Sequence, residues 1–195
     1  EGTHPAFLYQ QGTIRDALLA AVTLDIFNRH SDRVKMANLA QMVNVIHAII
    51  LTEGKNMVLT PTYYTFDLYK GHQDAALLGS WLETDEIGDA ESRIPSLSHT
   101  ASIKDGVLHL TISNLSPCRS EEIDCYLLGY TTETTQGRLL QGDMAAHNTF
   151  DCPEKVKPET LRDIKITDGG IRFTLPACAV AEIILDEKKI MGTKA

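Results

Sequence analysis

The first part of the chain carries apolar residues at helical spacing. Between residues 13 and 29 they recur at steps of three and four, which predicts a helix with a wide buried face. A second helix is predicted to begin at Pro61, because Thr60 is a favourable N-cap and proline is tolerated at the first helical position. We expect this second helix to end near Gly71.

The stretch between the two predicted helices is almost continuously apolar over residues 34–51. A run of this kind has no clear period. It is compatible with a short strand buried on both faces, which we place at residues 36–41, followed by an irregular excursion. Two helices and one strand cannot close a core, so the pattern indicates that this part belongs to a larger α/β domain whose remainder lies outside the chain.

From about residue 75 onward, short runs rich in Val, Ile, Leu, Thr and Tyr alternate with turn residues. Asp105 and Gly106 favour the positive φ angles of a tight turn, which predicts a hairpin of residues 98–104 and 107–113. Within that hairpin, Leu108, Leu110 and Ile112 are expected to face the core. Further strands are expected at residues 123–131, 137–141, 164–167, 171–175 and 180–186, with a turn at residues 168–170.

The two patterns together predict a chain of two parts. Residues 1–75 would be the α/β part and residues 76–195 an antiparallel β-sandwich of about eight short strands. The length of 195 residues and the 43% hydrophobic content are sufficient for one full core or two modest ones.

The charge balance and hydropathy exclude several classes of partner. Eighteen Lys and Arg residues against 26 Asp and Glu residues give a net charge of −8, so the basic stripe that binds nucleic acid or an anionic membrane is missing. The apolar stretches are shorter than the roughly 20 residues that span a bilayer. We expect a soluble, cytoplasmic protein. No secretory signal is visible, although a chain that begins at Glu1 leaves an upstream segment open.

The sequence offers little support for metal or cofactor chemistry. The four cysteines, Cys118, Cys125, Cys152 and Cys178, form no CxxC pair, which favours free buried thiols over disulfides or a structural zinc. The seven histidines are scattered singly and are interpreted as surface or core residues. Phosphate-binding, dinucleotide-binding, nucleophile-elbow and HExxH motifs are also missing from the sequence.

Gln41 and Asn44 interrupt the most apolar stretch of the first part. A side-chain amide in such a place must either satisfy its donors and acceptor within the protein or present them to a polar ligand. From the residues alone both interpretations stay open, and the structural one is favoured.

Two further polar stretches are interpreted as structural. The loop at residues 143–151 is expected to cap the sandwich.

The acidic cluster is considered as a catalytic site. A catalytic carboxylate pair in a glycosidase needs two carboxyl groups about 5 Å or roughly 6.5 to 9.5 Å apart in unlike environments. A cluster of like charges on one linker does not meet this need, and we expect a solvated surface at Glu83, Asp85, Glu86, Asp89 and Glu91.

Five stretches of sequence point to a known family. They are residues 5–11 (PAFLYQQ), 13–17 (TIRDA), 32–45 (DRVKMANLAQMVNV), 58–63 (VLTPTY) and 147–151 (HNTFD). In this order, and over nearly the whole chain, they resemble the C-terminal third of family 51 α-L-arabinofuranosidases. The resemblance implies the end of a (β/α)8 barrel followed by a β-sandwich of jelly-roll type.

The resemblance also implies a function. It points to a retaining, exo-acting hydrolase that removes terminal α-L-arabinofuranosyl groups from arabinan, arabinoxylan and related oligosaccharides without a metal or organic cofactor, and to a homo-oligomer. The two catalytic glutamates would lie on barrel strands upstream of Glu1. The chain would then contain no catalytic residue and would be inactive without the missing barrel portion.

The resemblance implies substrate-binding residues in this chain. Gln41 matches the family's Ala-Gln-x-Val-Asn motif at the C-terminal end of the last barrel strand, where sites of this fold are built, and is expected to bond an arabinose hydroxyl. Asn44 is the second candidate, shaping the adjacent loop. The alternative is a non-catalytic sandwich module that binds carbohydrate or mediates assembly, with an aromatic platform drawn from Trp81, Tyr126, Tyr130, Phe150 and Phe173.

Overall fold

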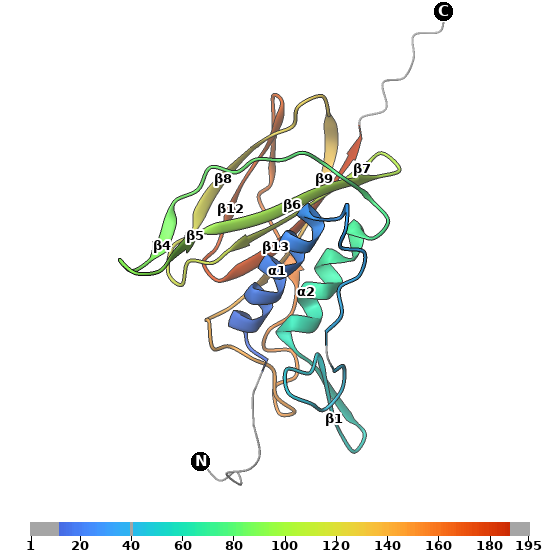
Figure 1. Ribbon diagram of the computed structural model, residues 1–195, viewed down its shortest axis with the longest axis vertical. Helices are drawn as coiled ribbons and strands as arrows, with labels where there is room; N and C mark the ends of the chain where they lie inside the picture. Colours follow the sequence, from blue (N-terminus) through green and yellow to red (C-terminus); the bar gives the residue numbers. More distant parts are fainter. Residues whose placement is uncertain (1–11, 40, 188–195) are drawn as a thin grey trace, which may run out of the picture.

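The computed structural model describes residues 12–39 and 41–187. Two helices and a small hairpin come first, and strands follow (Figure 1). The elements are α1 (Ile14–Arg29), β1 (Ile50–Glu53), β2 (Asn56–Leu59), α2 (Pro61–Tyr69), the 3-10 turn η1 (Lys70–His72), β3 (Ala76–Leu77), β4 (Glu86–Gly88), β5 (Arg93–Pro95), β6 (Leu97–Lys104), β7 (Val107–Asn114), β8 (Glu121–Tyr126), β9 (Thr132–Gln141), β10 (Glu159–Thr160), β11 (Lys165–Thr167), β12 (Gly170–Leu175) and β13 (Ala179–Glu187).

The strands build an antiparallel β-sandwich, which confirms the predicted fold class of the second part. One sheet has the order β10-β9-β13-β7-β6-β3 and the other has the order β11-β12-β8. Their inner faces enclose the main hydrophobic core, which contains Leu110, Ile171 and Ile183. The hairpin of β6 and β7 turns at Asp105 and Gly106, whose φ angles of 53° and 81° fit the predicted tight turn.

The outer face of the six-stranded sheet is covered by α1 and α2 (Figure 1). A second hydrophobic cluster fills this interface, where Ile14, Leu18 and Leu68 of the helices meet Leu140 and Val180 of the sheet. The sheet is therefore buried on both faces. This explains why β7 residues on the side opposite the main core are also inaccessible to solvent.

Both predicted helices are confirmed. The Asp16 carboxylate accepts a 2.8 Å hydrogen bond from the Thr13 backbone N–H and so caps the start of α1. The second helix begins at Pro61 as expected and ends at Tyr69, and η1 carries the chain to His72. Of the stretches that carried the family resemblance, residues 5–11 lie outside the described part of the chain.

The strand predicted at residues 36–41 is wrong. Residues 36–39 and 41 have no regular secondary structure, and Met36 and Gln41 are exposed rather than buried on two faces. A buried strand needs hydrogen-bonded neighbours along its length, and the rest of a barrel is not part of this chain. The apolar run instead leads into the hairpin of β1 and β2, which the pattern did not predict although Gly54 supplies its turn with a φ of 57°.

The strand boundaries also differ in places. The strand expected over residues 123–131 is shorter, because β8 ends at Tyr126, whereas β9 starts five residues before its expected beginning, at Thr132. The acidic linker holds a further small hairpin, β4 with β5. Among the described residues, no helix is long and apolar enough to cross a membrane.

Candidate functional site

Gln41 lies on the exposed segment between α1 and β1. Its side-chain amide forms no hydrogen bond with any residue that the structure describes. The amide can therefore offer two N–H donors and a carbonyl acceptor to a ligand, which suits the paired hydroxyl groups of a sugar.

Asn44, three residues further on, uses its amide within the protein. Its Nδ2 donates to the carbonyl oxygen of Thr52 at 3.1 Å and contacts the Thr52 hydroxyl at 2.8 Å, while its Oδ1 accepts from the Thr52 backbone N–H at 2.7 Å. Asn44 also has a φ of 54°, a left-handed conformation that asparagine tolerates better than most residues. The two predicted site residues thus share one segment but have different surroundings.

The segment that contains both residues is joined to β1 by a parallel bridge between Val43 and Ile50. The Asn44 N–H donates to the Ile50 carbonyl oxygen and the Ile50 N–H donates to the Met42 carbonyl oxygen, each at 3.1 Å. Sequence reasoning missed this bridge and missed Thr52 as a partner of Asn44.

The loop at residues 143–151 ties the hairpin and α1 to the sandwich. Asn148 donates from Nδ2 to the Leu59 carbonyl oxygen at 2.8 Å, at the end of β2. The first two N–H groups of α1, on Ile14 and Arg15, donate to carbonyl oxygens of the same loop. These contacts agree with the structural interpretation of the loop.

Two titratable groups are buried between the helices and the sheet. Asp25 of α1 is inaccessible to solvent, accepts hydrogen bonds from the hydroxyls of Tyr69 and Ser98, and has its pKa raised by burial to about 6. His72 is bonded to the hydroxyls of Ser102 and Thr111, and burial together with the nearby His109 lowers its pKa to about 4. Both groups join secondary-structure elements, so we assign them to the helix–sheet interface.

An ion-pair network fastens α2 to the same sheet. Arg138 of β9 contacts the Asp67 carboxylate of α2 at 2.6 Å and the Glu182 carboxylate of β13 at 2.7 Å. Glu182 is almost completely buried. These three charges therefore hold the helix on the sandwich.

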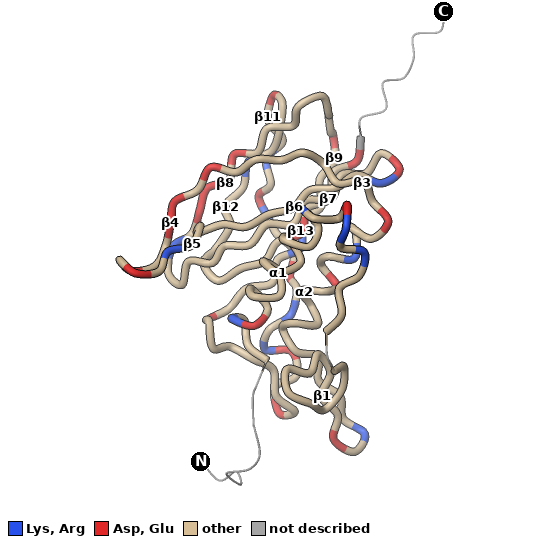
Figure 2. Tube along the Cα trace, in the orientation of Figure 1, with Lys and Arg blue, Asp and Glu red and all other residues tan. Residues whose placement is uncertain are grey.

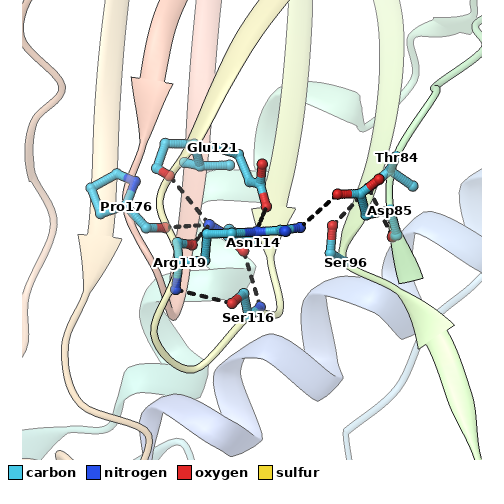
Figure 3. Close-up of polar contacts among 9 residues, drawn as sticks. Thr84, Asp85, Ser96, Asn114, Ser116, Arg119, Glu121 and Pro176 are labelled. Atoms are coloured by element: carbon cyan, nitrogen blue, oxygen red, sulfur yellow. Dashed lines mark hydrogen bonds and ion pairs between the residues drawn. The ribbon is translucent and has the colours of Figure 1, made fainter. Parts of the chain in front are cut away.

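The acidic cluster is a solvated edge of the sandwich, as expected from its composition. All five of its carboxylates are exposed, and acidic residues follow β4 and β8 along this edge (Figure 2). Arg119 lies between two of the carboxylates of the edge, at 3.1 Å from Asp85 and 2.7 Å from Glu121 (Figure 3). In the described part of the chain, no group of three or more His, Cys, Asp or Glu residues could hold a metal ion.

The aromatic residues considered for a carbohydrate platform lie in unlike surroundings. Trp81 is 79% exposed and Tyr126 is 72% exposed, whereas Phe173 lies in the main core. Tyr130 donates its hydroxyl hydrogen bond to backbone carbonyl oxygens. At most part of the predicted set can therefore meet a glycan.

The expectation that the cysteine thiols are buried is only partly correct. All four are free, and Cys178 is buried, but Cys118 and Cys152 are exposed. Both exposed cysteines lie in loops between strands, and such loops run over the protein surface.

Comparison with known proteins identifies a family model and relatives that match this chain. The family model described as "Alpha-L-arabinofuranosidase C-terminal domain" matches residues 1–179. An intracellular exo-α-L-arabinofuranosidase of Bacteroides ovatus is 41% identical over 187 residues, covering 94% of this chain and 36% of that protein. An exo-α-(1→6)-L-arabinofuranosidase of Bifidobacterium longum is 27% identical, covering 88% of this chain and 34% of that protein.

Solved structures agree with these sequence matches. The GH51 arabinofuranosidase from Xanthomonas axonopodis pv. citri superposes with a TM-score of 0.89 at 37% identity, covering 95% of this chain and 38% of that chain. An arabinose complex of the Thermotoga maritima α-L-arabinofuranosidase has a TM-score of 0.80 at 22% identity, covering 95% of this chain and 41% of that one, which supports the fold alone. The chain spans about a third of the length of the relatives it matches.

Proposed function

The chain belongs to the C-terminal domain family of the family 51 α-L-arabinofuranosidases, and on this premise we propose that it works as the C-terminal part of a retaining exo-acting enzyme. The complete enzyme would release terminal, non-reducing α-L-arabinofuranosyl groups from arabinan, arabinoxylan and arabino-oligosaccharides. Residues 1–75 would contribute the last part of the (β/α)8 barrel, and residues 76–195 would form the β-sandwich beside it.

In this proposal the chain binds substrate and leaves the covalent chemistry to the upstream barrel. A retaining glycosidase places two carboxyl groups about 5 Å apart, one as nucleophile and one as acid and then base, and needs no metal or cofactor for these steps. Both glutamates would come from the missing barrel portion, so the chain alone would be inactive. We also propose that the enzyme works in the cytoplasm as a homo-oligomer.

The observation that carries the proposal is the state of Gln41. It lies in a sequence stretch that matches the family, its side chain is exposed, and its amide has no partner in the described part of the chain. A neutral amide can both donate to and accept from the hydroxyls of an arabinofuranosyl group, which orients the sugar without adding charge. Asn44 would then shape the substrate site through its contact with Thr52 rather than through a bond to the sugar.

The proposal is tested by hydrolysis of p-nitrophenyl α-L-arabinofuranoside. The full-length enzyme that contains this chain should be active, and Gln41→Ala should lower kcat/KM about fivefold, corresponding to a lost hydrogen bond of about 1 kcal/mol. The loss would be larger if the bond strengthens in the transition state. Gln136→Ala, which removes another exposed amide on β9, is the matched control and should behave as the wild type. An inactive wild type, or an unchanged Gln41→Ala enzyme, would contradict the proposal.

The exposure of Trp81 and Tyr126 favours a second candidate function, in which the sandwich binds glycan without catalysis. In that case arabinan should bind to the isolated chain but not to its variant with both Trp81→Ala and Tyr126→Ala. The same two substitutions in the full-length enzyme should leave hydrolysis of the small chromogenic substrate unchanged. Absence of arabinan binding by the wild-type chain would eliminate this candidate.

A further inference from the structure

Asn44 lies on the same segment as Gln41, and its contact with Thr52 of β1 links that segment to the hairpin of β1 and β2. We propose that Asn44 and Thr52 are positioning residues that set the orientation of the Gln41 amide toward the sugar. This inference rests on the proposed function of Gln41. It assigns to the Asn44–Thr52 pair a role exerted through the backbone, with no contact to substrate.

The contact between the two residues has the form of a clamp. Both kinds of polar atom on the Asn44 amide are used, since Nδ2 reaches the Thr52 carbonyl oxygen and hydroxyl, and Oδ1 receives the Thr52 backbone N–H. A side chain engaged through its amide oxygen and its amide nitrogen with a single partner is poorly available to a ligand. It is well suited to holding two backbone segments at a fixed distance.

The clamp lies close enough to Gln41 to control its backbone. The Ile50 N–H donates to the carbonyl oxygen of Met42, the residue that follows Gln41. Before that point, within described residues 35–39 and 41, no backbone hydrogen bond to another element is formed. The bridge to β1 and the Asn44 clamp are therefore the first fixed points that the chain meets after Gln41.

The hairpin can serve as the fixed partner because it is anchored at its other end. All four residues of β1 pair with β2, and the carbonyl oxygen of Leu59, the last residue of β2, accepts from Asn148. The Thr60 N–H also donates to the Ile49 carbonyl oxygen at 3.0 Å. A continuous path of hydrogen bonds thus connects the sandwich loop, the hairpin and the Gln41 segment.

Because Asn44 has a left-handed backbone, the effect of losing its amide contact can be measured separately from the effect of changing its backbone conformation. Gly adopts a φ of 54° freely but has no amide, whereas Ala lacks the amide and also disfavours this φ. If the amide clamp positions Gln41, Asn44→Gly and Asn44→Ala should both lower kcat/KM. If only the backbone conformation matters, Asn44→Gly should retain wild-type activity.

The decisive experiment is a double-mutant cycle in the full-length enzyme with p-nitrophenyl α-L-arabinofuranoside. We expect Asn44→Gly to lower kcat/KM by about three- to fivefold, because misplacing the Gln41 amide can cost no more than the hydrogen bond that Gln41→Ala removes. In the Gln41→Ala background the same substitution should change kcat/KM less than about twofold, because its effect passes through Gln41. Thr52→Val should show a smaller loss of the same kind, and Thr52→Ser, which keeps the hydroxyl, should retain activity.

A matched control separates positioning from general destabilisation. Asn114 makes a comparable amide clamp in the sandwich, donating to the carbonyl oxygens of Arg119, Leu175 and Pro176 and accepting from the Ser116 N–H (Figure 3). Asn114→Ala should lower Tm, and its effect on kcat/KM should be fully additive with that of Gln41→Ala.

The possible outcomes are distinguishable. Additive effects of Asn44→Gly and Gln41→Ala, or wild-type activity of both Asn44→Gly and Thr52→Val, would overturn the positioning role while leaving the function of Gln41 intact. An unchanged Gln41→Ala enzyme would instead overturn the proposed function itself. Tm measurements on every variant show which ones are folded. Thr52→Val is a mild substitution that removes only the hydroxyl and keeps the hydrogen bonds of the Thr52 carbonyl oxygen and N–H to Asn44.

Discussion

The Asp25 carboxylate of α1 accepts a hydrogen bond of 2.6 Å from the hydroxyl of Ser98 on β6, 73 positions further along the chain. Asp25 is completely buried and Ser98 nearly so. The helices are thus joined to the sandwich by polar contacts as well as by an apolar cluster. A sheet face rich in small hydroxyl residues would be a poor surface for helices without such contacts, because each buried polar group needs a partner.

Asp25→Asn should stabilise the protein at neutral pH. Burial raises the pKa of Asp25 from 3.8 to about 6, so the folded state holds its proton more tightly than the unfolded state does. The stability that this group contributes is complete below pH 3.8 and is lost as the pH rises through 6, by roughly 3 kcal/mol in total. Urea unfolding at several pH values between about 3.5 and 7.5, with roughly half-unit steps, checks this.

The amide introduced by Asp25→Asn could keep both hydroxyl contacts, since it can donate to one and accept from the other. The free energy of unfolding of this variant should therefore change less with pH than that of the wild type. Asp151→Asn, which alters an exposed carboxylate, is the control and should keep the wild-type pH dependence. Equal pH dependence for the wild type and Asp25→Asn would refute the assignment.

His72→Gln should make the protein less sensitive to acid. Burial lowers the pKa of His72 from 6.5 to about 4, so the folded state disfavours the proton. The resulting stability is complete above pH 6.5 and is lost as the pH falls through 4, by up to about 3 kcal/mol. A glutamine can still reach Ser102 and Thr111 but does not titrate. As the pH is lowered from about 7 to 4, the Tm of the variant should fall less steeply than the Tm of the wild type. This pH dependence is opposite in sign to that of Asp25, whose contribution to stability is lost as the pH rises.

Arg138→Ala should destabilise the protein strongly. The substitution leaves the buried Glu182 carboxylate without its cation, and breaking a buried ion pair in this way typically destabilises by about 3 kcal/mol or more. The double substitution Arg138→Leu with Glu182→Leu should recover much of that loss, because the buried carboxylate is removed together with its cation and the more exposed Asp67 keeps its ion pair with Lys70. Lys157→Ala breaks an exposed pair with Glu154 and should leave the urea midpoint nearly unchanged. A midpoint for Arg138→Ala equal to that of Lys157→Ala would show that the network does not stabilise the fold.

Elements with strong local signals were predictable from the sequence. Pro61 marks a helix start and the Asp105–Gly106 pair marks a hairpin turn, and both depend only on local conformational preferences. The capping bond expected of Thr60 is not formed, because its hydroxyl has no hydrogen-bond partner among the described residues. The prediction of a strand at residues 36–41 was wrong because a strand does not depend on local preferences alone. A strand is completed by partners distant in sequence, and those of a barrel are not in this chain.

The hydrophobic and polar pattern of the sequence also did not predict that the outer face of the six-stranded sheet is buried. Alternation in β7 placed Thr111 and Ser113 opposite the main core, and polar residues in that position usually face water. They are buried because α1, α2 and the turn after α2 cover them, and the bond from Thr111 to His72 joins residues 39 positions apart. Gln41 and Asn44 were predicted through the family resemblance, but the bond from Asn44 to Thr52 needs a left-handed turn that no motif signalled.

Gly71→Ala should destabilise the protein through one close contact. A Cβ atom at this position would lie 2.3 Å from Nδ1 of His109, so η1 can approach β7 closely only because residue 71 has no side chain. The imidazole ring lies next to His72, with 6.4 Å between the ring centres, and its buried Nδ1 has no hydrogen-bond partner among the described residues. Overpacking of this kind destabilises typically by about 1 to 3 kcal/mol, so we expect a loss of roughly 2 kcal/mol.

Gly79→Ala is the matched control for this prediction. A Cβ at Gly79 would have no atom within 4 Å, and its backbone is compatible with other residues. This substitution should be neutral or slightly stabilising, because alanine reduces the conformational freedom of the unfolded chain. Urea unfolding of both variants measures the difference. If Gly71→Ala is as stable as Gly79→Ala, the ring of His109 must be free to move away, and the interface around His72 would be less tightly packed than its hydrogen bonds indicate.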